Sequence, residues 1–330
     1  MAPSTMKAIK IIEGNKAELQ DVPIPKLRDD YVLCKVTCVA LNPTDWKHIA
    51  RDTGKPGCTV GVDFSGVIED IGPKVTKKWQ KGDRVCGFVH GGNETQPEDD
   101  ASTLGTGVIT CGQSMYQNLG LPEPGNGKDN GFFLVYGGST ATGTLAVQYA
   151  VLSGYRVITT ASEHNHSLLK ALGAEEVFDY KDPSCGEKIH SYTNDSLTLA
   201  LDCIAEGDSP SICCAAISSK GGSINYLLVT PHPRTDVENK YAAGYTVVGE
   251  AFDKMGRHWE AQPEDFEYAK RFFELTHRLV DAGQLAVHPK TVCGHGLIGV
   301  FDGLEKLMEG KVSGKKLVYR VEETPKDRKA

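Results

Sequence analysis

The chain has 330 residues, 40% of them hydrophobic, and a formal net charge of −7 at pH 7. This length is enough to bury a sizeable core in about two domains, and the acidic balance disfavours a nucleic-acid partner, which would favour a basic face. The sequence has neither the apolar segment of a secretory signal nor a run of about 18 apolar residues. We therefore expect a soluble protein of the cytoplasm.

The first hundred residues predict a β-rich domain. Residues 6–11 and 31–40 alternate apolar and polar side chains, which is typical of strands with one buried face. Residues 60–71 and 85–89 are two further strand regions, and the turn sequence KGDR at 81–84 separates them.

Beyond residue 100 the pattern changes to short apolar strands that alternate with helices. A helix is predicted at 112–121 and a polar loop at 122–130. The strands that follow are expected at 132–136, 156–160, 177–180, 197–204 and 222–229, with a candidate sixth strand at 246–248. Such alternation implies parallel pairing, so we predict an α/β fold with a doubly wound parallel sheet. Helices at about 263–282 and 298–308 and a strand at 316–321 complete the chain.

The ten cysteines predict buried thiols rather than disulfides or a metal centre. No two of them form a C-x-x-C pair, which is the usual spacing of a zinc site. Cys34 and Cys38 alternate with apolar residues on one strand, where free cysteine behaves as a small hydrophobic residue. We therefore expect no bound metal.

The strongest local motif is the segment FFLVYGGSTATGTLAVQYA at 132–150. A buried strand leads directly into the turn Gly137–Gly143, and an amphipathic helix follows. Glycines let the backbone approach a pyrophosphate, and the helix N-terminus offers free N–H groups with partial positive charge. Ser139, Thr140 and Thr142 can add hydroxyl donors. The alternative is a glycine-rich turn in which Ser or Thr only caps the helix.

The end of the second strand of this domain indicates which dinucleotide is bound. NAD enzymes tend to place an acidic residue there, about 20 residues after the turn, to bind the ribose 2′-hydroxyl. Here the strand ends in Ala161-Ser162, and His164 and Asn165 follow. These donors favour a 2′-phosphate and hence NADPH, provided that Glu163 points away. An ordinary helix-capping role is the alternative for His164.

Several motifs recur in the order known from one enzyme superfamily: GVDFSG at 61–66, GDRV at 82–85, the turn at 137–143 and GKVSGKKLV at 310–318. Together they resemble the zinc-independent, quinone-reductase-like branch of the medium-chain dehydrogenase/reductases. NPTDWK at 42–47, SEHN at 162–165, GAEEVFDY at 173–180 and LDCI at 201–204 are similar to fungal trans-acting enoyl reductases. Those oxidoreductases act on CH-CH donors in secondary metabolism, where they serve polyketide synthases, as in the lovastatin pathway.

The resemblance implies a GroES-like catalytic domain from 1–103 and 286–330 and a Rossmann NADPH-binding domain from 104–285. It also implies the site residues. The expected cofactor contacts are Thr44, Asp45, Trp46, Lys47, Ser139, Thr140, Ala141, Thr142, Ser162, Glu163, His164, Asn165, Tyr180, Tyr226, Leu227, Val312 and Ser313. The expected substrate contacts are Leu104, Gly105, Thr106, Gly107, Val108, Ile109, Thr110, Cys111, Gly244, Tyr245, Thr246, Val247 and Val248. The zinc ligands and the four-cysteine lobe of zinc-dependent relatives are missing.

One departure from the family lies near residues 96–103. Relatives continue with further strands and a linking helix, whereas this chain passes almost directly from Gln96 to Leu104. About 25–35 residues are missing by comparison, so the GroES-like domain is expected to be truncated, at a cost that could exceed the usual net stability of ~5–15 kcal/mol.

The resemblance implies reduction of an α,β-unsaturated acyl thioester on a polyketide synthase carrier protein by a monomeric NADPH enzyme. Negative charge on the thioester oxygen and α-carbon must then be stabilised, and a proton must be supplied. The sequence shows no dedicated acid. Lys47 is the candidate catalytic residue, with a solvated helix lysine as the alternative. Two other functions remain open: a stand-alone NADPH quinone or enone reductase, and a catalytically impaired NADPH-binding or interaction protein.

Overall fold

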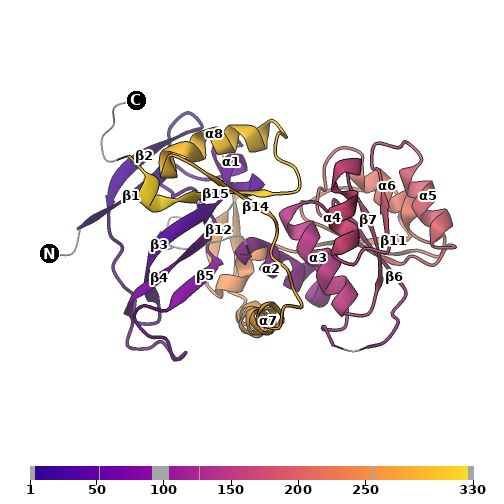
Figure 1. Cartoon of the computed structure of the whole chain (residues 1–330), viewed down its shortest axis with the longest axis horizontal. Coiled ribbons are helices and arrows are strands. Elements are labelled where there is room, and N and C mark those ends of the chain that lie inside the picture. Colours follow the sequence, from indigo (N-terminus) through magenta and orange to yellow (C-terminus); the bar gives the residue numbers. More distant parts are fainter. Residues whose placement is uncertain (1–3, 52, 91–103, 126, 255, 326–330) are drawn as a thin grey trace. The chain divides into compact units, whose positions relative to one another are not determined.

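The computed structural model describes residues 4–51, 53–90, 104–125, 127–254 and 256–325 (Figure 1). The chain divides into two compact units. One, here called the β-unit, comprises Met1–Thr106, Tyr245–Phe266 and Pro289–Ala330. The other, here called the Rossmann unit, comprises Gly107–Gly244 and Glu267–His288.

The β-unit is built on a five-stranded sheet with the strand order β14-β15-β3-β4-β5. Its strands are β3 (Val32–Ala40), β4 (Asp63–Ile71), β5 (Arg84–Phe88), β14 (Lys290–Cys293) and β15 (Lys316–Arg320). All neighbours pair antiparallel except β14 and β15, which are parallel. The strand regions predicted at 31–40, 60–71, 85–89 and 316–321 are therefore confirmed.

Smaller elements surround this sheet. They are the hairpins β1 (Thr5–Ile12) with β2 (Lys16–Pro23) and β12 (Phe252–Lys254) with β13 (Arg257–Trp259), the helices α1 (Pro43–Ala50) and α8 (Gly296–Met308), and the 3-10 turns η3 (Gly244–Val248) and η4 (Val321–Glu323). The largest apolar cluster of the unit contains Leu297, Val300 and Leu304 of α8, which pack with Leu317 and Tyr319 of β15. This core fixes the positions of α1 and β15, which carry polar side chains discussed below.

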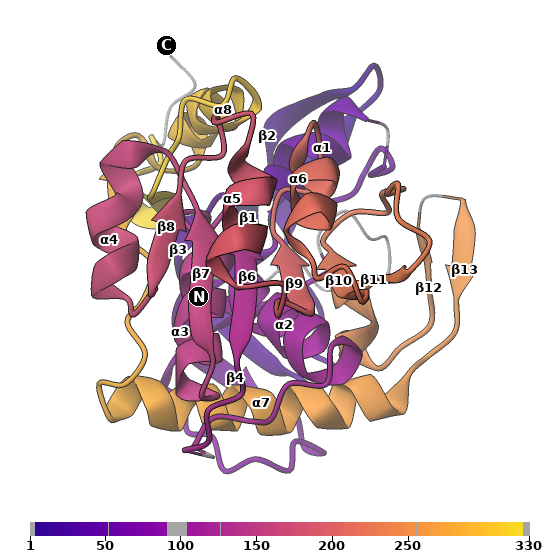
Figure 2. The same cartoon turned by 90° about the vertical axis from the view of Figure 1, so that its right-hand side faces the viewer.

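The Rossmann unit contains six parallel strands in the order β11-β10-β9-β6-β7-β8. They are β6 (Phe132–Tyr136), β7 (Arg156–Thr160), β8 (Glu176–Phe178), β9 (Leu199–Asp202), β10 (Gly222–Tyr226) and β11 (Val237–Tyr241). Figure 2 shows the sheet with β8 on the left and β11 towards the right. The first strand therefore lies in the middle, and the order reverses between β6 and β9, as in a dinucleotide-binding fold. The predicted doubly wound sheet is confirmed.

The helices of this unit connect the strands. They are α2 (Gly105–Cys111), which begins in the β-unit, the π-helix η1 (Gly112–Asn118), α3 (Ala141–Leu152), the 3-10 turn η2 (Glu163–Asn165), α4 (His166–Ala171), α5 (Cys185–Tyr192), α6 (Ser209–Ala216) and α7 (Pro263–Asp281), which begins in the β-unit segment. The sixth strand was wrongly predicted at 246–248, because η3 occupies that segment. The true sixth strand, β11, has the sequence VENKY and buries only Val237, so it lacks the apolar pattern of the other strands.

The two units differ from the expected domain boundaries mainly at Tyr245–Phe266, which lies in the β-unit. Within that unit, the Tyr245 ring contacts those of His90 and Phe252. Gly105 and Thr106 also belong to the β-unit, and the backbone N–H of Thr106 donates a 2.8 Å hydrogen bond to Asp63.

All ten cysteines are free. Six of them are buried, as predicted: Cys34, Cys58, Cys111, Cys185, Cys213 and Cys214. The prediction is wrong for Cys86, which is exposed on β5. Among the described residues, no helix combines the length and apolar composition needed to cross a membrane.

Candidate functional site

The glycine turn after β6 has the geometry of a phosphate cradle. Gly137 has a φ of +78°, which favours glycine. A Cβ on Gly138 would lie 2.0 Å from Thr159 Oγ1, and a Cβ on Gly143 would lie 2.3 Å from the carbonyl oxygen of Gly137. Side chains at these positions would clash with their neighbours, so the backbone is held close and bare at the carboxyl end of β6.

Helix α3 begins at this turn and is capped by Thr140. The Thr140 hydroxyl donates to the Gly137 carbonyl oxygen at 2.9 Å and accepts from the Gly143 N–H at 2.9 Å. The expected phosphate-donor role of this hydroxyl therefore competes with a capping role. The first-turn amides of α3 have no acceptor within the helix, and together with the helix dipole they favour an anion at this position. Ser139, Ala141 and Thr142 are half-buried around it.

The end of β7 brings together two of the predicted adenosine-side residues. The Ser162 and Tyr180 hydroxyls lie 3.2 Å apart, and Tyr180 is 40% exposed. Glu163 and His164 are exposed in η2, whereas Asn165 is buried. Ser162, Tyr180 and His164 are therefore accessible hydroxyl and imidazole groups on one side of the sheet edge, with Glu163 beside them.

The remaining predicted cofactor residues of this unit are placed differently. Tyr226 is fully buried in the apolar core of the unit, and its hydroxyl lies 3.8 Å from Cys214 Sγ. Leu227, which follows it, is half-buried and donates its N–H to the Asp202 carbonyl oxygen. Only the backbone at this position can therefore face a ligand without a change in the core. In the β-unit, Val312 is half-buried and Ser313 is exposed, both in the loop before β15.

Helix α1 of the β-unit carries the predicted nicotinamide-side residues. Its first turn is a capping box in which the Asn42 N–H donates to Asp45 Oδ2 at 2.7 Å. Asp45 is completely buried, and burial raises its pKa from 3.8 to about 7. The buried Asp45 side chain therefore caps the first turn of α1. Lys47 is half-buried, with Nζ 5.7 Å from the centroid of the Trp46 ring.

A buried polar network lies beside α1 and was not foreseen from the sequence. The Lys316 ammonium contacts Asp63 Oδ2 and donates to Asn42 Oδ1 at 2.9 Å. Asn42 Nδ2 donates to the same Asp63 oxygen at 2.8 Å, and Thr106 donates from its N–H and hydroxyl to the other oxygen at 2.8 and 2.7 Å. The Lys316 and Asp63 side chains are 3% and 0% exposed. This network, here called the polar centre, neutralises a buried carboxylate with a buried ammonium.

A second cluster joins η3 to α1. Thr44 Oγ1, Tyr245 Oη and His48 Nε2 form a triangle with sides of 3.1 to 3.2 Å. The Tyr245 ring stacks on His90 at a centroid distance of 4.3 Å, and Lys254 Nζ lies 4.3 Å from the Tyr245 ring centroid. We call these five residues the tyrosine cluster. Sequence reasoning assigned Thr44 and Tyr245 to the site but missed His48, His90 and Lys254, which have no motif around them.

The predicted substrate residues are divided between half-buried and buried positions. In η3, Gly244, Tyr245 and Val248 are half-buried, whereas Thr246 and Val247 are buried, and the Thr246 hydroxyl donates to Asp265. In α2, Val108, Ile109 and Cys111 have no exposed surface, while Thr106 and Thr110 are half-buried, as is Leu104 just before the helix. The apolar face of α2 therefore packs in the protein interior.

The sequence comparisons show the family of the chain. Residues 28–159 match the alcohol dehydrogenase GroES-like domain family, and residues 141–251 match the zinc-binding dehydrogenase family. The chain is 42% identical to the trans-enoyl reductase ACTTS2 of Alternaria alternata, with 96% of this chain and 99% of the relative covered. It belongs to the fungal trans-enoyl reductase family.

A second trans-enoyl reductase supports this membership, and a solved structure shares the fold. The trans-enoyl reductase TOXD of Cochliobolus carbonum is 42% identical, over 81% of this chain and 98% of the relative. The crystal structure of CurK enoyl reductase superposes with a TM-score of 0.75 at 17% identity, covering 96% of this chain and 99% of that one, and thus shares the fold. The chain is therefore an oxidoreductase of the medium-chain dehydrogenase/reductase superfamily, whose fold implies a nicotinamide cofactor.

The apparent shortening relative to trans-enoyl reductases falls outside the described residues. The alignment with ACTTS2 has 344 positions, more than the 330 residues of this chain, so this chain has gaps within it. Within the described residues, β5 is the last strand at its edge of the sheet. A Cβ on Gly105 would lie 2.3 Å from the Gly87 carbonyl oxygen, so the start of α2 approaches the backbone of β5 closely.

Metal binding finds no support among the described residues, where no group of three or more His, Cys, Asp or Glu side chains could hold an ion. Asn42 and Asp63 hold the Lys316 ammonium.

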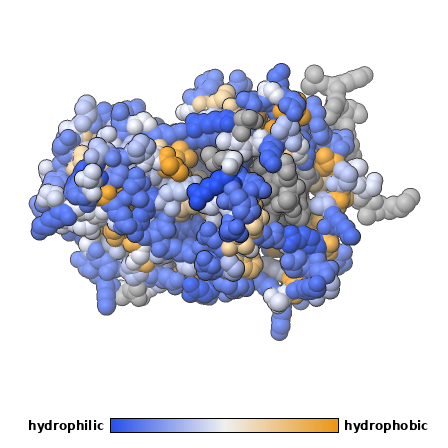
Figure 3. Space-filling model, turned by 180° about the vertical axis from the view of Figure 1, so that it is seen from behind, coloured by the Kyte–Doolittle hydropathy of each residue, from blue (hydrophilic) through white to orange (hydrophobic). Residues whose placement is uncertain are grey.

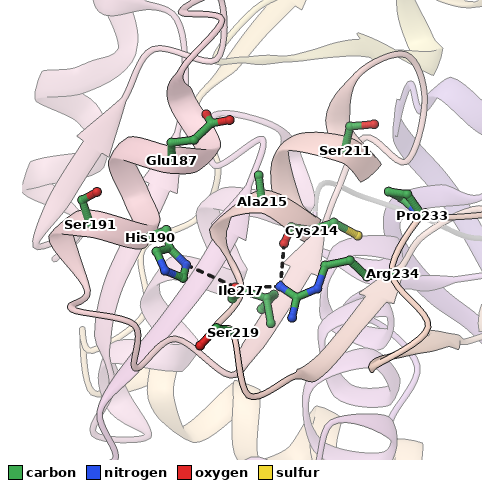
Figure 4. A pocket seen from close by; sticks show the side chains of 10 residues that line it. All are labelled: Glu187, His190, Ser191, Ser211, Cys214, Ala215, Ile217, Ser219, Pro233 and Arg234. Carbon is green, nitrogen blue, oxygen red and sulfur yellow. Dashed lines mark hydrogen bonds between the residues drawn. The ribbon is translucent and has the colours of Figure 1, made fainter.

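A pocket of about 570 Å³ in the Rossmann unit is separate from these groups (Figure 4). It lies between α5, α6 and the loop before β11, near the amino ends of β10 and β11, whereas the glycine turn follows the carboxyl end of β6. Its main cation, Arg234, donates to the carbonyl oxygens of Cys214, Ile217 and Ser218 and pairs with Asp236. Arg234 therefore caps the C-terminus of α6.

Proposed function

We propose that this trans-enoyl reductase uses NADPH to reduce the α,β-double bond of a polyketide acyl thioester carried by a synthase carrier protein. The glycine turn Gly137–Gly143 carries this proposal, because a Cβ on Gly138 or Gly143 would clash with neighbouring atoms of the protein, so the bare backbone is kept at the start of α3. Family membership supports the reaction class, since relatives such as ACTTS2 and TOXD are trans-enoyl reductases.

The Rossmann unit carries the residues proposed to hold the pyrophosphate and adenosine parts of the dinucleotide. The first-turn amides of α3 would hold the pyrophosphate, and Ser162, His164 and Tyr180 would surround the adenosine end. Thr44 and Lys47 of α1 would face the nicotinamide side. When bound, NADPH supplies a hydride for the β-carbon of the substrate. The residues of the chain must then orient the thioester, exclude water and stabilise the negative charge that develops on the thioester oxygen and α-carbon.

The proposed preference for NADPH over NADH rests on the end of β7. The Ser162 and Tyr180 hydroxyls lie 3.2 Å apart, and His164 is exposed two residues after Ser162, so a 2′-phosphate at this place would meet these three groups. Glu163 is exposed and can turn towards solvent. A carboxylate that instead accepted from the ribose 2′-hydroxyl would repel the phosphate.

The carrier-protein partner is proposed from the family and from the kind of surface present. On the face shown in Figure 3, hydrophilic residues predominate and hydrophobic ones occur in small scattered groups. Exposed large apolar side chains such as Val229, Phe266 and Met308 are separated along the sequence. Transient docking of a carrier through polar contacts suits such a surface better than a permanent apolar interface.

The decisive experiment compares cofactors and substrates on the purified full chain. NADPH and NADH are titrated by fluorescence, and the reduction of crotonyl-pantetheine is followed by NADPH absorbance. Selective NADPH binding with thioester turnover supports the proposal. Faster turnover of a diffusible enone or quinone would favour a stand-alone reductase. NADPH binding without turnover of any of these substrates would indicate a non-catalytic protein.

A further inference from the structure

Two loops lie side by side at the carboxyl ends of neighbouring strands in the Rossmann unit. The glycine turn follows β6, and the loop 203–208 follows β9, which pairs with β6 in parallel (Figure 2). The strand order reverses between these two strands, and open α/β sheets bind their ligands in the crevice at such a reversal. The loop after β9 therefore borders the same place as the glycine turn, although its residues were not among the predicted contacts.

Ile204 is the residue of this loop that lies against the glycine turn. A Cβ on Gly137 would lie 2.8 Å from Ile204 Cγ1 and 3.6 Å from Cys203 Cβ, so the loop and the turn are closely packed. The Ile204 side chain is nevertheless 38% exposed. This arrangement leaves a large apolar side chain open to solvent directly beside the turn that we propose for the pyrophosphate.

The Asp202 side chain holds this loop in place. Its Oδ1 accepts from the N–H groups of Ile204 and Ala205 at 2.8 and 2.9 Å. Its Oδ2 accepts from the Ser209 hydroxyl at 2.7 Å. Because Asp202 has no exposed surface, its carboxylate does not contact a ligand itself and acts only through the loop.

The backbone of the loop has an unusual conformation at Ala205. The φ of Ala205 is +54°, in the left-handed region that residues with a Cβ rarely adopt. Asp202 accepts from the Ala205 N–H, and the Thr230 hydroxyl donates to the Ala205 carbonyl oxygen at 2.8 Å. Both backbone groups of Ala205 are therefore hydrogen-bonded, which stabilises the conformation that places Ile204 at the turn.

The direction of the dinucleotide decides which part of it reaches Ile204. We place the adenosine end at Ser162 and Tyr180, which follow β7 and β8 on one side of β6. We place the pyrophosphate at the glycine turn after β6 itself. A dinucleotide that continues in the same direction next passes the carboxyl end of β9, on the other side of β6. The part that reaches Ile204 is then the nicotinamide riboside half.

We propose that Ile204 forms an apolar wall of the dinucleotide site at the nicotinamide riboside half, and that Asp202 is the positioning residue that holds this wall beside the glycine turn. This inference rests on the proposed use of NADPH and adds two residues to the site. The interaction is hydrophobic, since cofactor binding removes the exposed surface of Ile204 from water.

The test compares the binding of NADPH and of 2′,5′-ADP to the purified full chain by calorimetric titration. The fragment 2′,5′-ADP carries the adenosine with both phosphates but lacks the nicotinamide half, so it does not reach Ile204. Ile204→Ala should weaken NADPH binding at least about fivefold, because each buried methylene contributes roughly a fourfold change in affinity. The affinity for 2′,5′-ADP should stay within about twofold of the wild-type value.

The matched control is Val151→Ala. Val151 is 36% exposed, close to the value for Ile204, but it lies near the C-terminal end of α3, whereas the glycine turn lies at the N-terminal end. Val151→Ala should bind both ligands as the wild-type chain does. The Tm of both alanine variants without ligand should stay near the wild-type value.

Two substitutions of Asp202 test its positioning role. Asp202→Ala removes the acceptor of both loop N–H groups, so NADPH should bind at least about tenfold more weakly, while 2′,5′-ADP should bind within about threefold of wild type. Asp202→Asn keeps one acceptor oxygen for these groups and should recover most of the NADPH affinity. An aspartate that only supports folding would affect the two ligands alike.

The outcomes separate this inference from the proposed function. NADPH affinity of Ile204→Ala within about twofold of wild type overturns the inference alone. Equal losses of NADPH and 2′,5′-ADP affinity in Ile204→Ala or in Asp202→Ala do the same. Should Asp202→Ala not fold, Ile204→Ala decides by itself. A folded wild-type chain that binds neither ligand overturns the proposed function as well.

Discussion

In the Rossmann unit the candidate phosphate site consists of consecutive residues, from Gly137 to Gly143, and acts mainly through backbone amides. In the β-unit the polar centre combines side chains that are far apart in the sequence, since Lys316 reaches Asp63 across 253 positions and Asn42 across 274. The first site depends on the absence of side chains. The second depends on the presence of every partner, because its members are buried and charged.

This contrast indicates different sensitivities to mutation. Phosphate binding by backbone amides is lost when an added side chain displaces the turn, whereas a change in charge nearby alters the turn little. A buried ion pair fails when one partner is neutralised, since the remaining charge stays in a medium of low polarity. Substitutions in the two regions should therefore separate steric effects on cofactor binding from electrostatic effects on folding.

The largest effect is expected for Lys316→Met. The substitution leaves Asp63 buried without its ammonium partner, which typically costs about 3–5 kcal/mol in the free energy of unfolding. Urea unfolding followed by circular dichroism measures this change. The neighbouring Lys315→Met, at an exposed position, should have almost no effect.

The double variant Lys316→Met with Asp63→Asn examines the cause of that loss. Removing the orphaned charge should restore at least about half of the lost stability, because Asn can still accept from Thr106. A double variant that is less stable than Lys316→Met would argue against the electrostatic explanation and in favour of a packing role for the lysine stem.

The next effect concerns the pH dependence of folding. Burial raises the pKa of Asp45 from 3.8 to about 7, so its ionised form is disfavoured in the folded protein. The stability contributed by the protonated carboxyl is present below pH 4 and is lost as pH rises through about 7. Asp45→Asn should therefore gain about 2–3 kcal/mol relative to wild type between pH 5 and pH 8.

Urea unfolding of both proteins at a series of pH values measures this relative gain. The variant Asp302→Asn, which changes an exposed carboxylate, serves as the control and should show no comparable gain. A difference between Asp45→Asn and wild type that stays constant with pH would mean that Asp45 is ionised in the folded chain at pH 5.

Gly143→Ala should have an intermediate effect on stability and a clear effect on binding. The new Cβ would lie 2.3 Å from the Gly137 carbonyl oxygen, and the clash costs about 1–3 kcal/mol if the turn shifts. NADPH affinity, measured by fluorescence, should fall at least about tenfold. The matched control is Gly294→Ala, where nothing lies within 4 Å of the added Cβ. Equal NADPH affinity in both variants would show that the glycine turn is not part of the NADPH-binding site.

The same contrast explains which features could be predicted from the sequence. The glycine turn and the five strands β6 to β10 were predictable because their patterns are local. The edge strand β11 was not, because its residues Glu238, Asn239 and Lys240 are polar and its pairing with β10 is a tertiary feature. His48, His90 and Lys254 meet Tyr245 only after β5, η3 and β12 have packed together. The Tyr226 side chain fills the core, so the expected cofactor contact at this position is left to the backbone.

The smallest expected effect is that of Ser162→Ala on the choice of cofactor. The Ser162 hydroxyl is half-exposed beside Tyr180, and a neutral hydrogen bond to a phosphate at such a site contributes about 1 kcal/mol. NADPH affinity should fall by about three- to fivefold, while NADH affinity stays constant, because NADH has no 2′-phosphate. Ser167→Ala on the exposed face of α4 is the control. A parallel loss for both cofactors would show that Ser162 only supports the η2 turn, so the 2′-phosphate would have to be recognised by other groups.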